Sequence, residues 1–144
     1  MEQSPQPPHS PDKLDPALFE AMVEQAGDAI IFIDRKGAVR AWNRGAENIF
    51  GYSAAEALNN SLDVIIPERL RQAHWDGFNR AIKSGRTRNG DRILTTRSVH
   101  KDGHKIYVDL RFCLIADSSG AIAGALAIGR DCTQRYLAEK ALKQ

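Results

Sequence analysis

The sequence predicts an α+β domain in which one antiparallel sheet carries helices on a single face, with a further helix at each end. An amphipathic helix comes first, followed by two extended segments, three helical segments, three more extended segments and a last helix. Short turns containing glycine join extended segments, as in antiparallel pairs. Elements in this order indicate an α+β architecture.

The beginning of the chain is rich in proline and is followed by the first helix. Five of the six prolines lie within the first 16 residues, so we expect residues 1–14 to be a disordered tail. Residues 15–27 predict an amphipathic helix because Asp15 is a suitable N-cap, Pro16 suits the first turn and Gly27 ends the segment. Its apolar stripe consists of Leu18, Phe19, Met22, Val23 and Ala26.

The next segments predict a hairpin and two short helices. Residues 28–35 and 38–42 are rich in apolar and β-branched residues, and the turn between them ends in glycine. Asn43 is a suitable N-cap for one short helix. Ser53 and Glu56, three residues apart, form the capping box of a second.

A longer helix is predicted from Pro67, which can occupy its first turn, to about Ser84. Leu70, His74, Phe78 and Ile82 recur on it at a spacing of four residues. This spacing places them on one face. We therefore expect His74 to point toward the core.

Three strands and a last helix complete the predicted fold. The strands cover residues 92–100, 104–116 and 121–129, and a tight turn at 101–103 joins the first two. A helix is expected over 133–144. In the middle strand, alternation places Val108, Leu110, Phe112 and Leu114 on one face and Tyr107, Asp109, Arg111 and Cys113 on the other. The last strand has a face of small residues, namely Ala123, Ala125, Ala127 and Gly129.

Composition and charge argue against several functional classes. With 144 residues, 42% hydrophobic and 26% charged, the chain is typical of one soluble domain with a core. The net charge of +2 argues against a dedicated nucleic-acid binder. The apolar runs at 29–33 and 121–128 are far shorter than the roughly 20 residues that cross a bilayer. The N-terminal segment has no apolar signal core, so we expect a cytoplasmic protein that binds neither nucleic acid nor membrane.

The reactive residue types form no catalytic pattern. No nucleophile–base pair, glycine-rich phosphate loop or carboxylate pair is present, so we do not expect an enzyme. Cys113 and Cys132 lie in apolar stretches and are expected to be buried free thiols. His100 and His104 flank a turn, which suggests a metal, but no third ligand stands at a suitable spacing and Asp102 is interpreted as a turn residue. We expect two exposed turn histidines.

Several phrases in their order resemble the PAS domain, the sensory module of bacterial signalling proteins. They are DAIIFIDRKGAVRAWNRGAENIFGYSAAEAL, IIPERLRQAH, HKDGHKIYVDLRF and GRDCTQR, and the resemblance covers about residues 18–138. It implies a PAS fold over 28–132, with a five-stranded antiparallel sheet and a ligand cavity between the long helix and the sheet. Residues 133–144 would then be a signalling helix.

Within the family, residues 67–103 are similar to the haem-binding PAS domains of FixL-type rhizobial oxygen sensors. The resemblance implies that His74 is the iron ligand and that Arg80 and Arg88 contact the haem propionates. The sequence departs from the pattern at Leu94, which falls about where those domains place an oxygen-sensing arginine. Arg92 is two residues away. Sensing specific to oxygen is therefore not expected.

Basic residues gather around these positions. Between residues 69 and 97 the chain carries Arg69, Arg71, Arg80, Lys83, Arg86, Arg88, Arg92 and Arg97 against only Asp76 and Asp91. An anionic ligand bound here would be paired with this basic cluster. A five-coordinate haem needs one protein nitrogen, an apolar cavity and cations near its carboxylates. His74, the face of Leu110 and Phe112, the small residue Ala127 and the two arginines supply these requirements.

The sequence therefore predicts a PAS sensor that binds b-type haem through His74 and reports a diatomic gas or redox state. The alternative is an interaction module, whose cavity holds side chains or a metabolite, and in which His74 is a core histidine bonded to a backbone carbonyl. A flavin is less favoured, because residues 60–63 read Asn-Ser-Leu-Asp and lack the cysteine of flavin photochemistry. We also expect a homodimer, formed through the first helix and the outer sheet face, and a signalling partner or an effector domain elsewhere.

Overall fold

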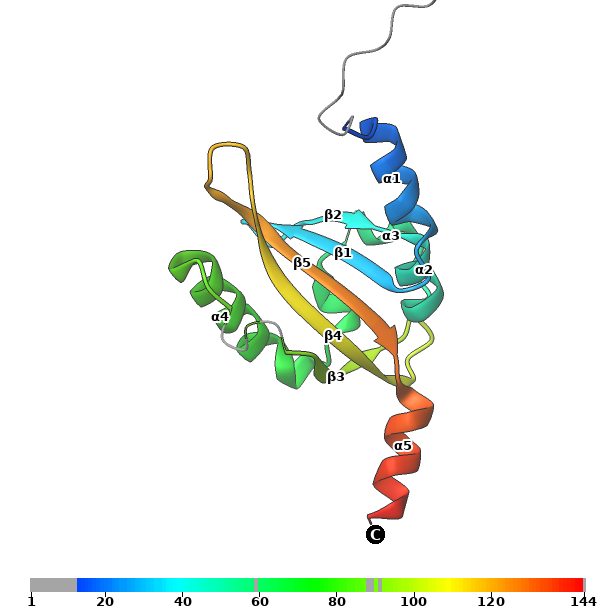
Figure 1. Ribbon diagram of the computed structural model, residues 1–144. Coiled ribbons are helices and arrows are strands. Elements are labelled where there is room, and N and C mark those ends of the chain that lie inside the picture. Colours follow the sequence, from blue (N-terminus) through cyan, green and yellow to red (C-terminus); the bar gives the residue numbers. More distant parts are fainter. Residues whose placement is uncertain (1–12, 59, 88–89, 91, 144) are drawn as a thin grey trace, which may run out of the picture.

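In the computed structural model, residues 13–58, 60–87, 90 and 92–143 are described, and over this part of the chain the predicted α+β architecture is confirmed (Figure 1). One antiparallel sheet has the strand order β2-β1-β5-β4-β3. The strands are β1 Ala29–Asp34, β2 Val39–Trp42, β3 Leu94–Val99, β4 Lys105–Ala116 and β5 Ile122–Asp131. The expected tail lies largely outside the described residues.

The helices are close to their predicted positions. They are α1 Pro16–Gln25, α2 Arg44–Phe50, α3 Ala54–Leu58, α4 Glu68–Ser84 and α5 Thr133–Leu142. A 3₁₀ helix, η1 Leu62–Ile65, was not predicted. Pro67 is the N-cap of α4 and precedes its first turn, so that expectation was wrong by one residue. Both α1 and α5 project away from the sheet (Figure 1).

The core lies between one face of the sheet and the short helices. Ile31 and Ile33 of β1, together with Val108 of β4, are buried there. Ala46, Phe50, Ala57, Leu62 and Ile65 cover them from α2, α3 and η1. Gly45 is required for this packing, because a Cβ atom at that position would lie 2.1 Å from the carbonyl oxygen of Asp28.

The two cysteines are free, as predicted, but they differ in burial. Cys132 is buried at the start of α5, whereas Cys113 is half-buried. Cys113 lies on the outer face of β4, opposite Leu126 of β5, and this face is only partly covered. The expectation that both thiols are buried therefore holds for Cys132 alone.

Asn43 joins the first helix, the first strand and the second helix. Its side chain is almost wholly buried. Oδ1 accepts hydrogen bonds from the backbone amides of Ile30, at 2.8 Å, and Ala46, at 3.0 Å. Nδ2 donates to the carbonyl oxygens of Val23 and Asp28 at 2.8 and 3.0 Å, and to that of Ala26 at 3.3 Å. One side chain thus caps α2 and fixes the end of α1.

Asn43→Ala is expected to lower the free energy of unfolding by about 2–4 kcal/mol, because it leaves several buried backbone groups without partners. Urea unfolding followed by circular dichroism measures the change. The control is Asn60→Ala, since the side chain of Asn60 is exposed and, among the described contacts, donates to the carbonyl of Glu56 alone. That variant should lose less than about 1 kcal/mol, and an equal loss in both would contradict the role given to Asn43.

The start of α5 is held against β4. Tyr107 of β4 was expected on the outer face, and it is buried there because Tyr136 stacks on it with ring centroids 3.9 Å apart. The Tyr107 amide donates to Thr133 Oγ1, and the Cys132 amide donates to the Tyr107 carbonyl. Arg135 pairs with Asp109 at 2.7 Å. These contacts join the C-terminal helix to the sheet.

Asp109 makes this junction sensitive to acid. The hydrogen bond from Thr95 is the largest of several contacts that lower the pKa of Asp109 below its ordinary value of 3.8. A lowered carboxyl pKa stabilises the folded state above the ordinary value, and this contribution is lost as the pH falls through the lowered one. Asp109→Asn should therefore lower the free energy of unfolding by about 1 kcal/mol at pH 7.

The difference between Asp109→Asn and the wild type should shrink as the pH falls below 3.8. Urea unfolding at a series of pH values measures it. Asp76→Asn is the control, because Asp76 is exposed on α4 and bonds Gln72 alone among the described contacts. A difference for Asp109→Asn that persisted unchanged into the acid range would contradict the assignment.

Candidate functional site

A cavity lies between α4 and the strands β3, β4 and β5, and its volume is about 980 Å³. His74, Phe78 and Arg80 line it from α4. Leu94, Phe112 and Ala125 line it from the three strands. A cavity at the upper end of the range for small-molecule sites, about 300–1,000 Å³, has room for a cofactor.

Helix α4 is anchored near its first turns rather than along its length. Trp75 Nε1 donates to Asp63 of η1 at 2.7 Å, and Arg71 Nε donates to the carbonyl of Ile66 at 3.0 Å. The ring of Phe78 meets Trp75 edge-on, with centroids 5.4 Å apart. No residue of α4 is fully buried. The helix is therefore fixed at η1 and leaves space between itself and the sheet.

His74 faces this space, as its spacing on the helix predicts. Its ring is half-buried, and Nδ1 is buried with no hydrogen-bond partner among the described residues. Burial lowers the pKa of His74 below the ordinary 6.5, and the nearby charge of Asp63 opposes this effect. The imidazole is therefore neutral at pH 7. An unpartnered buried polar atom costs about 1–3 kcal/mol, so this nitrogen lacks the backbone partner expected of a core histidine.

The strand residues predicted for the site separate into two groups. Leu94 and Phe112 line the cavity. Leu110 and Ala127 are buried in the core beside it, since Leu110 pairs with Leu94 and Ala127 pairs with Phe112. Ala125, one of the small residues of β5, reaches the cavity.

Three small residues of α4 were missed as part of the site. Ala73, Gly77 and Ala81 line the cavity beside His74 and Phe78. They recur every four residues, and this spacing was visible in the sequence. Their small side chains widen the space in front of His74.

The edge of the cavity is cationic. Arg80, Lys83, Arg86 and Arg92 line it, together with the hydroxyl residues Ser84 and Thr87. Arg88, the second predicted propionate contact, lies outside the described residues. Apolar walls with cations at one edge suit a flat apolar ligand that bears carboxylates or phosphates.

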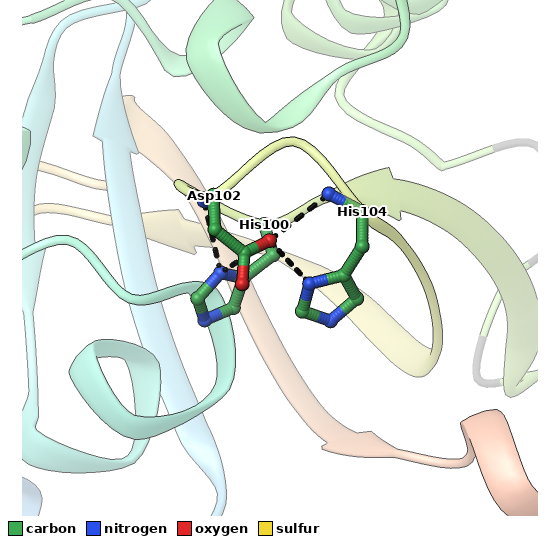
Figure 2. Close-up of side chains that lie close together, drawn as sticks. All are labelled: His100, Asp102 and His104. Carbon is green, nitrogen blue, oxygen red and sulfur yellow. Dashed lines mark hydrogen bonds and ion pairs between the residues drawn. The ribbon is translucent and has the colours of Figure 1, made fainter.

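The structure corrects the expectation for His100 and His104. Asp102 of the intervening turn turns its carboxylate to both rings, so that a third donor atom is present (Figure 2). The two histidines lie side by side, as their positions around the turn suggest, and the turn adds the Asp102 carboxylate, which was interpreted as a turn residue only. None of the three lines the cavity beneath α4.

Comparisons with known proteins identify the fold and several relatives. The sequence model of the PAS fold matches residues 17–132. The chain is 28% identical over 127 residues to the oxygen sensor protein DosP of Escherichia coli (strain K12), and the aligned region covers 88% of this chain and 16% of DosP. It is 36% identical over 47 residues to the sensor protein FixL of Bradyrhizobium diazoefficiens, covering 33% of this chain and 9% of FixL. The chain thus spans less than a fifth of these two relatives.

Solved structures agree on the fold. A PAS domain from Colwellia psychrerythraea superposes with a TM-score of 0.70 at 24% identity, over 82% of this chain and 97% of that one. An RNA-binding Light-Oxygen-Voltage receptor gives a TM-score of 0.71 at 20% identity, over 98% of this chain and 40% of that one. None of the described helices has the length and apolar character needed to cross a membrane.

Proposed function

The chain belongs to the PAS family of sensor domains, and from this premise we propose that the cavity beneath α4 binds a b-type haem through His74 and reports a diatomic gas or a redox state. The observation that carries the proposal is the buried Nδ1 of His74, which has no partner among the described residues beside a cavity of cofactor size. The resemblance to haem-binding PAS domains points to the same histidine. A relative named as an oxygen sensor supports it.

The residues around the cavity fit the requirements of haem. His74 is neutral and would hold the iron. Phe112 and Leu94 form apolar walls that would pack against the haem ring. Arg80 would pair with a propionate at the cationic edge. The iron of a bound haem would take up a diatomic gas or change its redox state. Leu94 has no hydrogen-bond donor to offer a gas, so we do not propose selectivity for oxygen. Arg92 lines the same cavity and does carry a hydrogen-bond donor.

A route from the cavity to the end of the chain supports a sensory role. Ala125 touches the cavity from β5, and β5 continues through Cys132 directly into α5. A shift of β5 at the cavity would change the direction in which α5 leaves the sheet. We propose that α5 passes the signal to an effector, either in the same polypeptide or on a partner, in the cytoplasm, and that this domain itself is not catalytic.

The second candidate is a PAS interaction module without haem. Its support is the cationic edge of the cavity, which would equally take an anionic metabolite. A flavin with photochemistry is disfavoured, since the stretch at 60–63 lacks the required cysteine. The two candidates are separated by haem binding itself.

Reconstitution of the tag-free full chain with haemin is expected to give a Soret band at one haem per chain. His74→Ala should abolish stoichiometric haem binding, because the bond to iron is lost. Added imidazole should be able to restore the binding, because the cavity remains. His104→Ala is the matched control and should load normally, since His104 lies outside the cavity. Unchanged haem spectra in His74→Ala would contradict the assignment, and no Soret band in the wild type would favour the interaction module.

Arg80→Ala is expected to speed the loss of haem to a heme-scavenging globin several-fold and to weaken the salt dependence of that loss, because an exposed ion pair is screened by salt. Arg40→Ala removes the same charge from the exposed side of β2, outside the cavity, and is the control. Equal rates and equal salt dependence in the two variants would show that Arg80 does not hold a propionate.

We also propose a homodimer through α1 and the outer face of the sheet. No residue of α1 is buried, and its apolar stripe is exposed, with Phe19 at 52% and Met22 at 59%. A free amphipathic helix of this length is marginal in water without a packing partner. On the outer sheet face, Ile115 and Ile128 are also exposed. A second copy would cover both surfaces.

The double variant Phe19→Glu, Met22→Glu is expected to be monomeric in sedimentation velocity at micromolar concentration, where the wild type is dimeric, because two charges would be buried in the interface. Substitution is preferable to truncation, since removing α1 would also remove Val23, a hydrogen-bond partner of Asn43. Glu20→Gln, Glu24→Gln is the control on the same helix and should stay dimeric. A monomeric wild type would contradict the dimer.

A further inference from the structure

The turn between β3 and β4 gathers three potential metal ligands. The His100 amide donates to the carbonyl of His104 at 2.9 Å, and the Gly103 amide donates to that of His100 at 2.8 Å. This tight turn brings the side chains of His100, Asp102 and His104 together (Figure 2). The two imidazole rings stack with centroids 4.6 Å apart. One ligand atom from each residue lies within 4.8 Å of the other two.

We propose that His100, Asp102 and His104 form a binding site for a divalent transition-metal ion such as Zn²⁺, Ni²⁺ or Cu²⁺. Imidazole nitrogen with one carboxylate oxygen is a donor set that suits these ions better than Mg²⁺ or Ca²⁺. Ligand atoms about 2.0–2.2 Å from one ion lie roughly 3–3.6 Å from each other. The distance from His100 Nδ1 to Asp102 Oδ1 is 3.3 Å, so this pair already has ligand spacing, and the three ligand atoms would have to move together from separations of up to 4.8 Å.

The donor atoms are already oriented by the turn. The Asp102 amide donates to Nδ1 of His100 at 3.1 Å, so this nitrogen carries a lone pair rather than a proton, and an ion bound there would take the place of that amide hydrogen. The His104 amide donates to Asp102 Oδ1 at 3.0 Å and holds the carboxylate toward the rings. Asp102 also accepts from the ring of His104. Metal binding would displace one ring proton and replace this contact by a shared ion.

The neighbouring helices hold the turn in place. The Lys101 amide donates to the carbonyl of Phe50 at 2.9 Å, and Lys101 Nζ pairs with Glu56 of α3 at 2.6 Å. Gly51, at the end of α2, makes room for the ring of His100, since a Cβ atom there would lie 2.5 Å from its Cε1. Its φ of +83° is also one that glycine adopts without strain. The site is therefore supported on one side by α2 and α3.

The site is open to solvent on its other side. The side chains of His104 and Asp102 are 56% and 61% exposed, whereas that of His100 is 24% exposed. Three protein ligands leave at least one coordination position for water. These features favour an exchangeable ion over a permanent structural one. Because none of the three residues lines the cavity beneath α4, the inference is independent of haem binding.

Calorimetric titration of the tag-free full chain with ZnCl₂, and separately with NiCl₂, tests the site. We expect one ion per chain, and at least a tenfold weaker affinity in both His104→Ala and Asp102→Asn, because each removes one of three ligands. Asp102→Asn keeps a hydrogen-bond acceptor in the turn and guards against an effect of misfolding, which circular dichroism checks. His9→Ala and His74→Ala are matched controls that remove the chain's other two histidines, and they should bind within twofold of the wild type.

Proton NMR of the histidine rings locates the ion directly. Addition of one equivalent of diamagnetic Zn²⁺ should shift the ring proton resonances of His100 and His104 and leave those of His74 in place. The proposal is overturned if no ion binds below about millimolar concentration. It is also overturned if His104→Ala and Asp102→Asn bind as the wild type does, or if His9→Ala or His74→Ala abolishes binding.

Discussion

The hydrogen bonds of Asn43 are the constraint on which the arrangement of the N-terminal half depends. One buried amide satisfies the amides of Ile30 and Ala46 and the carbonyls of Val23, Ala26 and Asp28. A buried network of this kind stabilises only when every member has its partner. It therefore couples three elements: the exposed helix α1, the strand β1, which lies next to the central strand β5, and the helix layer that begins with α2. Gly45 allows the backbones to approach closely enough for this to happen.

The cavity exists because α4 is fixed at its beginning and has small residues where it faces the sheet. Trp75 and Arg71 tie the helix to η1 and to the residue that follows it. Ala73, Gly77 and Ala81 on the helix, and Ala125 on β5, leave the space unfilled. The same arrangement buries Nδ1 of His74 without giving it a partner among the described residues. The same packing of α4 thus anchors the helix at one end and leaves the cavity between the helix and the sheet.

The sequence was most informative where a local rule determines the structure. The caps at Asp15 and Asn43 and the capping box of Ser53 and Glu56 are formed by hydrogen bonds within a few residues, and all three are present. The inward direction of His74 followed from helical spacing.

The burial of Tyr107 could not be foreseen, because it depends on Tyr136 returning across the outer face of β4. The contribution of Asp102 beside the two histidines was missed because ligand spacing rules describe helices and loops better than a three-residue turn. The long-range hydrogen bond between Trp75 and Asp63, which anchors α4, is likewise one that no sequence pattern reports.

The position of β5 has a mechanical consequence. Strand β5 lies in the middle of the sheet and is hydrogen-bonded along both sides, to β1 from Ala29 to Asp34 and to β4 from Val108 to Ala116. A strand held by two ladders cannot slide along its axis, because even a slip of one residue would break both ladders and turn its side chains to the wrong faces. It can still twist, as sheets do readily. In the signalling role proposed for it, α5 would consequently receive rotation and tilt from β5 rather than a piston-like push, and so would deliver torque to its effector.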